Sequence, residues 1–382
     1  GVVTATVSNN DIATLETLTG TGNAYTTVVQ DTTAAASDLN ALIAKTSVAI
    51  NASATTTVTG SLSDLNTLYV TNTGWTGQGS EAITVSDAAI NASQLTAINA
   101  ATDQLITLSS ATSISGQGDQ IEALYDANAT NQLTGLDGDL TVTISGDSGS
   151  PTQIEADNLK AVDADTTGLV TIDSSATSLS GTLANVHDVL TANKLDATNT
   201  TGVATPTISG LDNLAVTITD ANITIAELED IQNNYTTGVI TATIEGSTIA
   251  ALLDDTGTAT GAGTNDIVSG NALTLTVTTA SLTAAQLIEL NAMTTGLITV
   301  THTVGAAARP TITGSVADLK TVMDASAASG NAIAGIADAT LVTSDTGNVS
   351  AADLKTLIAA TSHQLNIDTV TQITGLVADI NS

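Results

Sequence analysis

The sequence contains no cysteine, no phenylalanine and a single tryptophan among its 382 residues. The absence of cysteine excludes a disulfide framework, thiolate zinc sites and cysteine catalysis. Aromatic residues make up 1% of the chain although 42% of it is hydrophobic, so Ala, Val, Leu and Ile carry the apolar content. A core built from such side chains consists of many small, similar layers instead of a few large anchors.

Basic residues are also scarce, with 6 Lys and Arg against 38 Asp and Glu, a formal net charge of −32 and a pI near 4.1. Such a surface repels nucleic-acid phosphates and anionic headgroups, so we expect no nucleic-acid binding. No uninterrupted apolar run is long enough for direct membrane insertion. Disorder conflicts with the mean hydropathy of +0.26. The first residues lack the features of a signal peptide, so we expect a mature chain, a fragment, or export without an N-terminal signal.

One phrase recurs along the chain with a leucine at a fixed place. Two copies are TIAELEDIQNNYTTGVITATIEG, from Thr224, and TAAQLIELNAMTTGLITVTHTVG, from Thr283. Aligned copies place six leucines in equivalent positions, spaced by 56 to 69 residues: Leu39, Leu95, Leu159, Leu228, Leu287 and Leu354. We expect these leucines to be buried and stacked in one column.

A second phrase, T-x-(S/T)-G followed by an amphipathic segment, alternates with the first. Its glycines are Gly60, Gly116, Gly181, Gly246, Gly314 and Gly375, spaced by 56 to 68 residues. Both markers therefore give a period near sixty residues made of two half-units. We expect these glycines at strand-to-helix corners, where glycine permits a positive φ or a close backbone approach.

Local patterns predict short helices and strands in alternation. Helices should begin at Asn91, Thr224, Thr283 and Ser350, where a capping side chain stands three residues before a carboxylate or amide. Runs such as VITATI, residues 239–244, alternate β-branched residues with threonine and are typical of strands. Strands that alternate with short helices are expected to pair in parallel through right-handed crossovers.

The sequence therefore predicts an α/β repeat solenoid, with short parallel β-strands alternating with short helices in about six repeats of roughly 60 to 67 residues. We expect residues 1–382 to form a single elongated solenoid. Its approximate repeats are 31–86, 87–146, 147–219, 220–278 and 279–344, with partial repeats at 1–30 and 345–382. Both ends read as unfinished units, so we also expect them to continue one another head to tail.

Aspartates recur where the strand before a first-phrase helix ends. Asp31, Asp87 and Asp220 lie eight residues before their leucines and Asp345 lies nine before, whereas Thr279 takes this place in one copy. As a ladder of carboxylates they are candidate Ca²⁺ ligands. As single side chains they would close Asx turns, the interpretation we favour.

The densest acidic loop, LTGLDGDLTVTISGDSGS, adds Asp137, Asp139 and Asp147 to the candidates. It lacks the spacing and the terminal Glu of an EF-hand, and a solvated turn is the alternative. With Asp87 and Asp220, these three residues complete the set of candidate metal ligands. Calcium is the one cofactor that the sequence suggests.

The three histidines, His187, His302 and His363, are scattered over different repeats without an acidic partner at catalytic or metal spacing. The chain has no GxSxG, HExxH or P-loop sequence. Its six basic residues are too dispersed for a solenoid polysaccharide-active enzyme, which needs acids and a base on one face. We therefore expect no enzyme and no catalytic or cofactor-binding residue.

Threonine is frequent on the predicted strands. Flat threonine arrays order water in ice-binding solenoids, but the register of TATI, TVTHTV and TIDSSATSLS varies, which argues against such an array here. Threonine more commonly marks the solvent side of a half-buried strand.

The phrase (S/T)-A-A-(D/E/Q)-L-x-x-(L/I)-x-A-x-T-T-G, paired with T-x-(S/T)-G-(S/T)-x-A-D-L, resembles the repeat arrays of very large secreted bacterial surface proteins. Such arrays occur in adhesin-like proteins of marine cyanobacteria and proteobacteria, often exported by type I secretion and carrying calcium-binding RTX repeats elsewhere. The resemblance covers essentially the whole chain and implies a secreted or cell-surface location. The GGxGxD nonapeptides that bind calcium in those proteins are absent here.

Together these features favour a structural extracellular protein, a bacterial fibre, stalk or surface-layer element. Its expected partner is a further copy of itself, in a head-to-tail homo-oligomer or filament. The alternative is an adhesin that binds surface glycans or another partner through its variable loops. Ice binding and polysaccharide chemistry on a solenoid are further alternatives.

Overall fold

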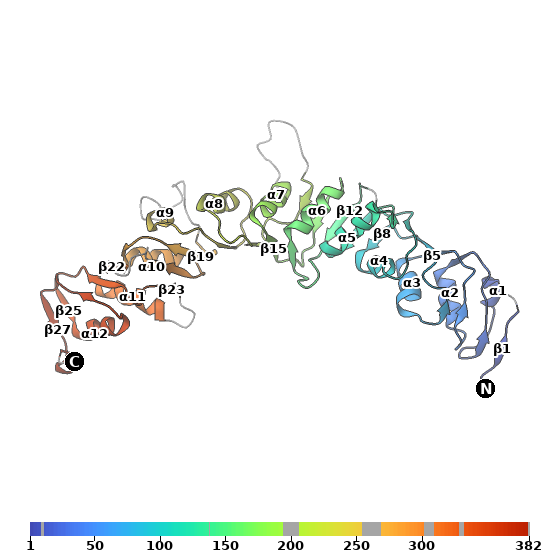
Figure 1. The fold of residues 1–382 in the computed structure, drawn as a ribbon, viewed down its shortest axis with the longest axis horizontal. Coiled ribbons are helices and arrows are strands. Elements are labelled where there is room, and N and C mark those ends of the chain that lie inside the picture. Colours follow the sequence, from blue (N-terminus) through green and yellow to red (C-terminus); the bar gives the residue numbers. More distant parts are fainter. Residues whose placement is uncertain are drawn as a thin grey trace, which may run out of the picture. The chain divides into compact units, whose positions relative to one another are not determined.

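The computed structural model describes residues 1–8, 11–136, 138–193, 206–253, 269–301, 309–327 and 332–380. The chain divides into two compact units. The N-terminal unit comprises Gly1–Leu179 and Asp188–Leu211, and the C-terminal unit comprises Ser180–His187 and Asp212–Ser382. In each unit short strands alternate with short helices along the ribbon (Figure 1). A single solenoid over the whole chain stays a prediction.

The helices are short. They are α1 (Ile12–Leu15), α2 (Ala36–Ile43), α3 (Leu62–Asn66), α4 (Ala92–Asn99), α5 (Gly118–Ala129), α6 (Ala156–Asp165), α7 (Leu183–Asn193), α8 (Ile225–Asn234), α9 (Ile249–Leu253), α10 (Ala284–Met293), α11 (Val316–Ala327), α12 (Ala351–Ala360) and α13 (Val377–Ile380). A π-helical turn, η1 (Thr67–Thr71), directly follows α3. None of the helices in the described ranges is long and apolar enough to cross a membrane.

The strands of the N-terminal unit form two five-stranded sheets and two strand pairs. The first sheet has the order β11 (Leu133–Thr134), β9 (Ile106–Leu108), β7 (Ala82–Val85), β5 (Thr57–Gly60), β3 (Thr33–Ala35). The second has the order β16 (Ile208–Ser209), β14 (Val170–Ile172), β12 (Thr141–Ile144), β10 (Ser113–Gly116), β8 (Ala89–Asn91). The pairs are β1 (Thr4–Thr6) with β2 (Ala24–Thr26) and β4 (Ile50–Asn51) with β6 (Trp75–Thr76).

The C-terminal unit is organised in the same way. Consecutive neighbours in one sheet are β17 (Ala215–Ile218), β18 (Ile240–Thr243), β19 (Ala272–Val277), β21 (Ile298–Val300) and β23 (Ile333–Ala334). A four-stranded sheet joins β20 (Ser281–Thr283), β22 (Thr311–Gly314), β24 (Thr340–Thr343) and β26 (Leu365–Asn366), and β25 (Asn348–Ser350) pairs with β27 (Gln372–Thr374). Of the two remaining strands, β13 (Gln153–Glu155) belongs to the N-terminal unit, and β15 (Ser178–Gly181) has residues in both units.

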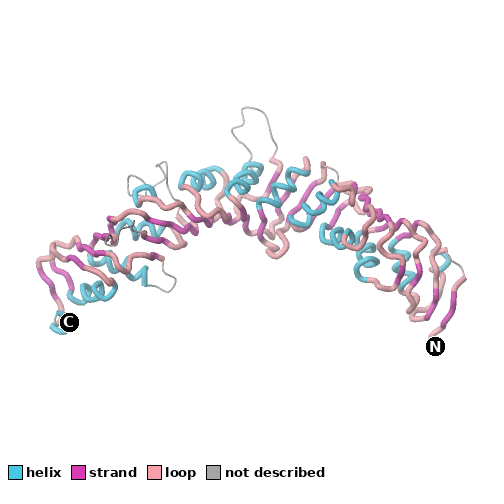
Figure 2. Tube along the Cα trace, viewed as in Figure 1, coloured by secondary structure: helices cyan, strands magenta, loops and turns pink. Residues whose placement is uncertain are grey.

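The sheets named above are parallel and open, and the described residues form no closed barrel. The coarse prediction of an α/β fold with short parallel strands alternating with helices is therefore confirmed. We call a helix together with the strands that lie between it and the preceding helix a βα unit. Neighbouring βα units pair through their strands and also touch through their helices, as α5 and α6 or α11 and α12 do (Figure 2).

Each helix from α1 to α12 buries the side chain at its fourth position. The six leucines of the first phrase hold this position and are at most 6% exposed, which confirms their predicted equivalence and burial. The intervening helices place Leu15, Leu65, Ile121, Val186, Leu252 and Leu319 there, and these are also buried. The same buried helix position therefore occurs in both half-units. Its strands add buried rows that are in register, such as Val58, Ile83 and Ile106.

The recurrent glycines of the second phrase lie where a side chain would come too close to a neighbouring part of the chain. A Cβ on Gly116 would lie 2.7 Å from the Cβ of Ala92, the first residue of the preceding helix. Gly60, Gly314 and Gly375 approach the first alanines of α2, α10 and α12 in the same way, at 2.7 to 3.1 Å. The predicted close approach is confirmed at these four corners. At Gly246 the nearest atom is instead Cγ2 of Thr278, at 3.3 Å.

Candidate functional site

The recurrent aspartates bind the helix of the preceding βα unit. Their carboxylates accept the first backbone N–H of α1, α3, α7 and α11, in the bonds Ile12–Asp31 at 2.9 Å, Leu62–Asp87 at 2.6 Å, Leu183–Asp220 at 2.5 Å and Val316–Asp345 at 2.7 Å. The first N–H groups of a helix have no acceptor within the helix, and a negative charge is favourable there. Each carboxylate thus caps a helix 19 to 37 residues earlier in the chain.

Strand register explains why this contact recurs. Gly60 pairs with Val85 and Gly314 pairs with Thr343. Two residues beyond each pair, a helix begins after the first strand, and the aspartate follows the second strand. The contact follows from parallel pairing between βα units and differs from the Asx turn that we favoured, in which the acceptor serves its own turn.

In one copy a threonine hydroxyl takes over this role. Thr279 accepts the N–H of Ile249, at the start of α9, at 2.8 Å. The copy that departs from the aspartate pattern therefore keeps the hydrogen bond and loses the charge. The shared property of these positions is an acceptor oxygen at the start of the neighbouring helix.

Asp147, from the acidic loop, is 4% exposed, and its carboxylate accepts three hydrogen bonds. Its Oδ1 accepts the N–H of Asp119 at 2.9 Å and the side-chain amide of Asn158 at 2.9 Å. Its Oδ2 accepts the N–H of Glu155 at 2.6 Å. Both oxygens are therefore used by donors from α5, α6 and the residue before α6.

The other metal candidates lie apart. Asp87, Asp147 and Asp220 each contact a different helix, Asp139 is exposed, and Asp137 lies outside the described residues. In the part of the chain that the structure describes, no three His, Asp or Glu residues are arranged to hold a metal ion. Calcium binding stays a prediction.

The TTG of the first phrase has a structural role that the sequence did not reveal. The first threonine is buried, and its hydroxyl donates to a carbonyl of the preceding βα unit while it accepts the N–H of the glycine. For Thr294 the bonds reach Leu273 O at 2.8 Å and the N–H of Gly296 at 2.9 Å. Thr166 repeats the arrangement with Leu140 O at 2.9 Å and the N–H of Gly168 at 3.0 Å. A second set of side chains thus ties adjacent units together.

The few basic residues mostly pair with acids of a neighbouring helix or loop. The pairs are Lys160 with Asp188 at 2.6 Å, Arg309 with Asp338 at 2.9 Å and Lys320 with Asp353 at 2.5 Å. The bond to Asp353 raises the pKa of Lys320. Exposed pairs of this kind are screened by water and contribute little to stability.

The histidines do not assemble a site. His187 lies 3.2 Å from Asp230 and packs edge-on against Tyr235, a partner that sequence spacing did not predict. His363 is exposed, and its backbone N–H is bound to Thr361. His302 lies outside the described residues.

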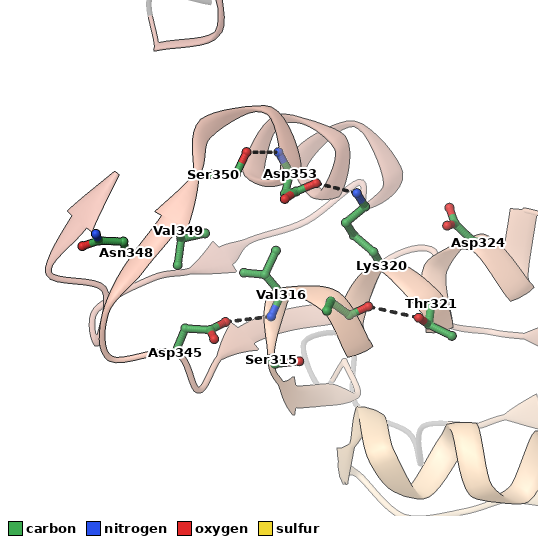
Figure 3. Close-up of a pocket in the computed structure, with 11 residues that line it drawn as sticks. Ser315, Val316, Lys320, Thr321, Asp324, Asp345, Asn348, Val349, Ser350 and Asp353 are labelled. Atoms are coloured by element: carbon green, nitrogen blue, oxygen red, sulfur yellow. Dashed lines mark hydrogen bonds and ion pairs between the residues drawn. The ribbon is translucent and has the colours of Figure 1, made fainter. Parts of the chain in front are cut away.

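An open hollow of about 430 Å³ lies between α11 and α12 (Figure 3). Asp345, bound to the N–H of Val316, stands at one side and the pair of Lys320 and Asp353 at the other. Asp345 with Val316 and Lys320 with Asp353 are contacts between neighbouring βα units, so the hollow gathers contacts that join two units.

Helices α5 and α6 carry a cluster of acidic residues. Partial burial, followed by the charges of Asp126 and Asp165, raises the pKa of Glu122. Burial also raises the pKa of Asp165, and Asp126 adds to the shift. In both cases the folded chain favours the protonated form, so this patch opposes folding when it is ionised.

No family model matches the chain, and no curated protein or solved structure is significantly similar to it.

Proposed function

We propose that the chain is a structural extracellular protein, a solenoid that builds a bacterial surface fibre, stalk or surface-layer element by end-to-end assembly. The proposal rests on one observation, namely what the recurrent polar side chains bind. The aspartates, Thr279 and the buried threonines of the TTG phrase all bind a neighbouring βα unit. Each unit presents the same contacts to the next. These side chains therefore allow the array to be extended by further units.

Exposed apolar residues in the last described βα unit support assembly. Ile373 on β27 and Val377 on α13 are 43% and 73% exposed. Their equivalents in the α11 unit, Ile312 and Val316, are 0% and 7% exposed. The difference arises because β22 is paired on both edges, with β20 and β24, whereas β27 is paired on one edge, with β25. A further βα unit against β27, from a continuing chain or from another copy, would cover these side chains and extend the sheet.

Electron microscopy and light scattering of the purified protein, over a range of concentrations and with and without calcium, test the proposal. We expect rods that lengthen as the concentration rises. Val377→Asp should shorten them, because a charge then lies in the contact. Val70→Asp is the matched control, since Val70 is 51% exposed within the N-terminal unit. A compact monomer at every concentration, or equal effects of both variants, would contradict end-to-end assembly.

The register of the strands favours a second candidate, binding of ordered water or ice. Hydroxyls align across neighbouring strands in the row Thr59, Thr84, Thr107 and Thr134, so the register is more regular than the sequence indicated. Adjacent strands lie about 4.8 Å apart, which sets the spacing of the row. Ice-recrystallisation inhibition that is lost in Thr84→Lys and kept in Ser37→Lys, on the exposed side of α2, would support this candidate. No inhibition by the unmodified protein would exclude it.

A further inference from the structure

The segment that follows α3 has an unusual local structure. The helix continues into the π-helical turn η1, and β6 carries Trp75, the only tryptophan of the chain. The indole packs edge-on against Tyr69 with ring centres 5.5 Å apart, and its Nε1 donates to Leu68 O at 3.2 Å. The side-chain amide of Gln78 donates to Tyr69 O at 2.8 Å. These bonds hold the chain after β6 against η1, and π-helical turns are frequent at functional sites.

This segment encloses a carboxyl group. Glu81, the residue before β7, is 0% exposed. Its Oε2 accepts the N–H of Gly79 at 2.9 Å and the hydroxyl of Tyr69 at 3.3 Å. Its Oε1 has no hydrogen-bond partner among the described residues. Such an oxygen is uncommon in folded proteins, and a bound water or ion is a common explanation.

No basic side chain in the described ranges forms an ion pair with Glu81. The basic residues whose contacts are described bind other groups, namely Lys45, Lys160, Arg309 and Lys320. Burial, followed by the charge of Glu81, raises the pKa of Tyr69 above its usual range, so the tyrosine stays a neutral donor. A glutamate side chain is ordinarily negative at neutral pH. Because buried charges are paired or coordinate metal ions, this group calls for a cation that the side chains do not supply.

Backbone oxygens also lie near this carboxyl group. The turn of residues 77–80 passes beside it, since the N–H of Gly79 is bonded to Oε2. Gly77 and Gly79 give the turn φ values of 101° and 98°, which favour glycine. Ala101 O lies 3.5 Å from the place that a Cβ of Gly79 would take. This carbonyl follows the C-terminal end of α4, where the helix dipole attracts positive charge.

We propose that residues 67–81 hold a monovalent metal cation, sodium or potassium, with Glu81 Oε1 and neighbouring backbone carbonyls as its ligands. Carboxylate and carbonyl oxygens are the ligands of such hard cations. A monovalent ion balances the single carboxylate, whereas a divalent ion would leave a net charge buried. A water molecule in the same place would satisfy Oε1 and leave the negative charge unbalanced. The proposal does not depend on end-to-end assembly.

Exchange of cations at constant ionic strength tests the proposal. Choline chloride is the reference salt, because a protein with a net charge of −32 is stabilised by the screening that any salt provides. Replacing choline by sodium or potassium should raise Tm by roughly 3 to 10 °C once the ion exceeds its Kd by about 10- to 100-fold. Trp75 emission should follow the same saturation curve, since Trp75 contacts Tyr69, which is bonded to Glu81.

The decisive variant is Glu81→Gln, which keeps the shape of the side chain and removes its charge. Its Tm and emission should no longer distinguish choline from sodium or potassium. Asp103→Asn is the matched control, because Asp103 is an exposed acid close by in the chain, and this variant should keep the response. Crystals grown in rubidium chloride, with rubidium in place of potassium, should show anomalous density beside Glu81 Oε1.

Three outcomes in solution would overturn the proposal. The first is equal Tm in choline, sodium and potassium salts. The second is a response that persists in Glu81→Gln or disappears in Asp103→Asn as well. The third is a response to calcium that neither sodium nor potassium produces, which would indicate a divalent site. If Glu81→Gln fails to fold, the rubidium crystals decide, and density beside Oε1 without an anomalous signal refutes the assignment in favour of water.

Discussion

Replacement of Asp87 by alanine isolates the contact between βα units. The change removes the acceptor at 2.6 Å from the N–H of Leu62, the first residue of α3. Loss of a capping acceptor costs about 0.5 to 2 kcal/mol, and loss of a negative charge at a helix N-terminus accounts for about 0.3 to 1 kcal/mol of such effects. For a domain of about 200 residues, Tm should fall by roughly 1 to 8 °C.

The chain itself provides the control. Thr279 makes the equivalent bond with a hydroxyl at 2.8 Å, so Asp87→Thr should keep the hydrogen bond and lose only the charge. We expect the loss of stability to rank Asp87→Ala above Asp87→Thr, measured by calorimetry and by hydrogen exchange in α3. The reciprocal change, Thr279→Asp, should stabilise α9.

Calcium separates this role from metal binding. If Asp87 only caps α3, calcium shifts the Tm of the unmodified protein and of Asp87→Thr equally. Two results would refute the reasoning: equal destabilisation by threonine and alanine, or a calcium-dependent gain in Tm that Asp87→Thr abolishes.

Three further predictions concern other parts of the repeat. Gly116→Ala brings a Cβ within 2.7 Å of the Cβ of Ala92 and should cost about 1 to 3 kcal/mol in chemical denaturation, whereas Gly347→Ala, with open space around it, should not. Thr294→Val leaves Leu273 O and the N–H of Gly296 without their partner and should cost about 1 to 3 kcal/mol in the same assay. The pKa of Glu122 is raised in the folded chain, so its ionisation costs stability at neutral pH, and that cost disappears as the pH falls through the folded pKa. Glu122→Gln should therefore stabilise the protein at neutral pH and have less effect in acid, with the opposite trend contradicting the sign.

Local patterns in the sequence were sufficient to predict the helices and their buried faces. The capping boxes at Thr224 and Thr283 are complete in the structure, and Asn91 and Ser350 also cap their helices. Each of these bonds spans three residues, so its two partners can be read from one short segment. Leu287 and its equivalents follow from the same local periodicity.

Contacts between βα units were predicted less completely. The partner of Asp220 is the N–H of Leu183, 37 residues earlier, and only the pairing register of the intervening strands brings them together. The first threonine of TTG recurs in the sequence. Its hydroxyl, however, donates to a backbone carbonyl, a group that every residue has and that no sequence pattern marks. The pairing of His187 with Asp230 was missed because the two residues lie far apart in the sequence.

Hydrogen exchange at single helix-start amides tests the central claim most directly. First-turn N–H groups have no acceptor inside their helix and ordinarily exchange fast. If neighbouring βα units cap one another, the amides of Leu62, Leu183, Ile249 and Val316 should be protected as strongly as amides in the middle of their helices. Exchange of these four amides at the rate of open chain, within otherwise protected helices, would contradict the account.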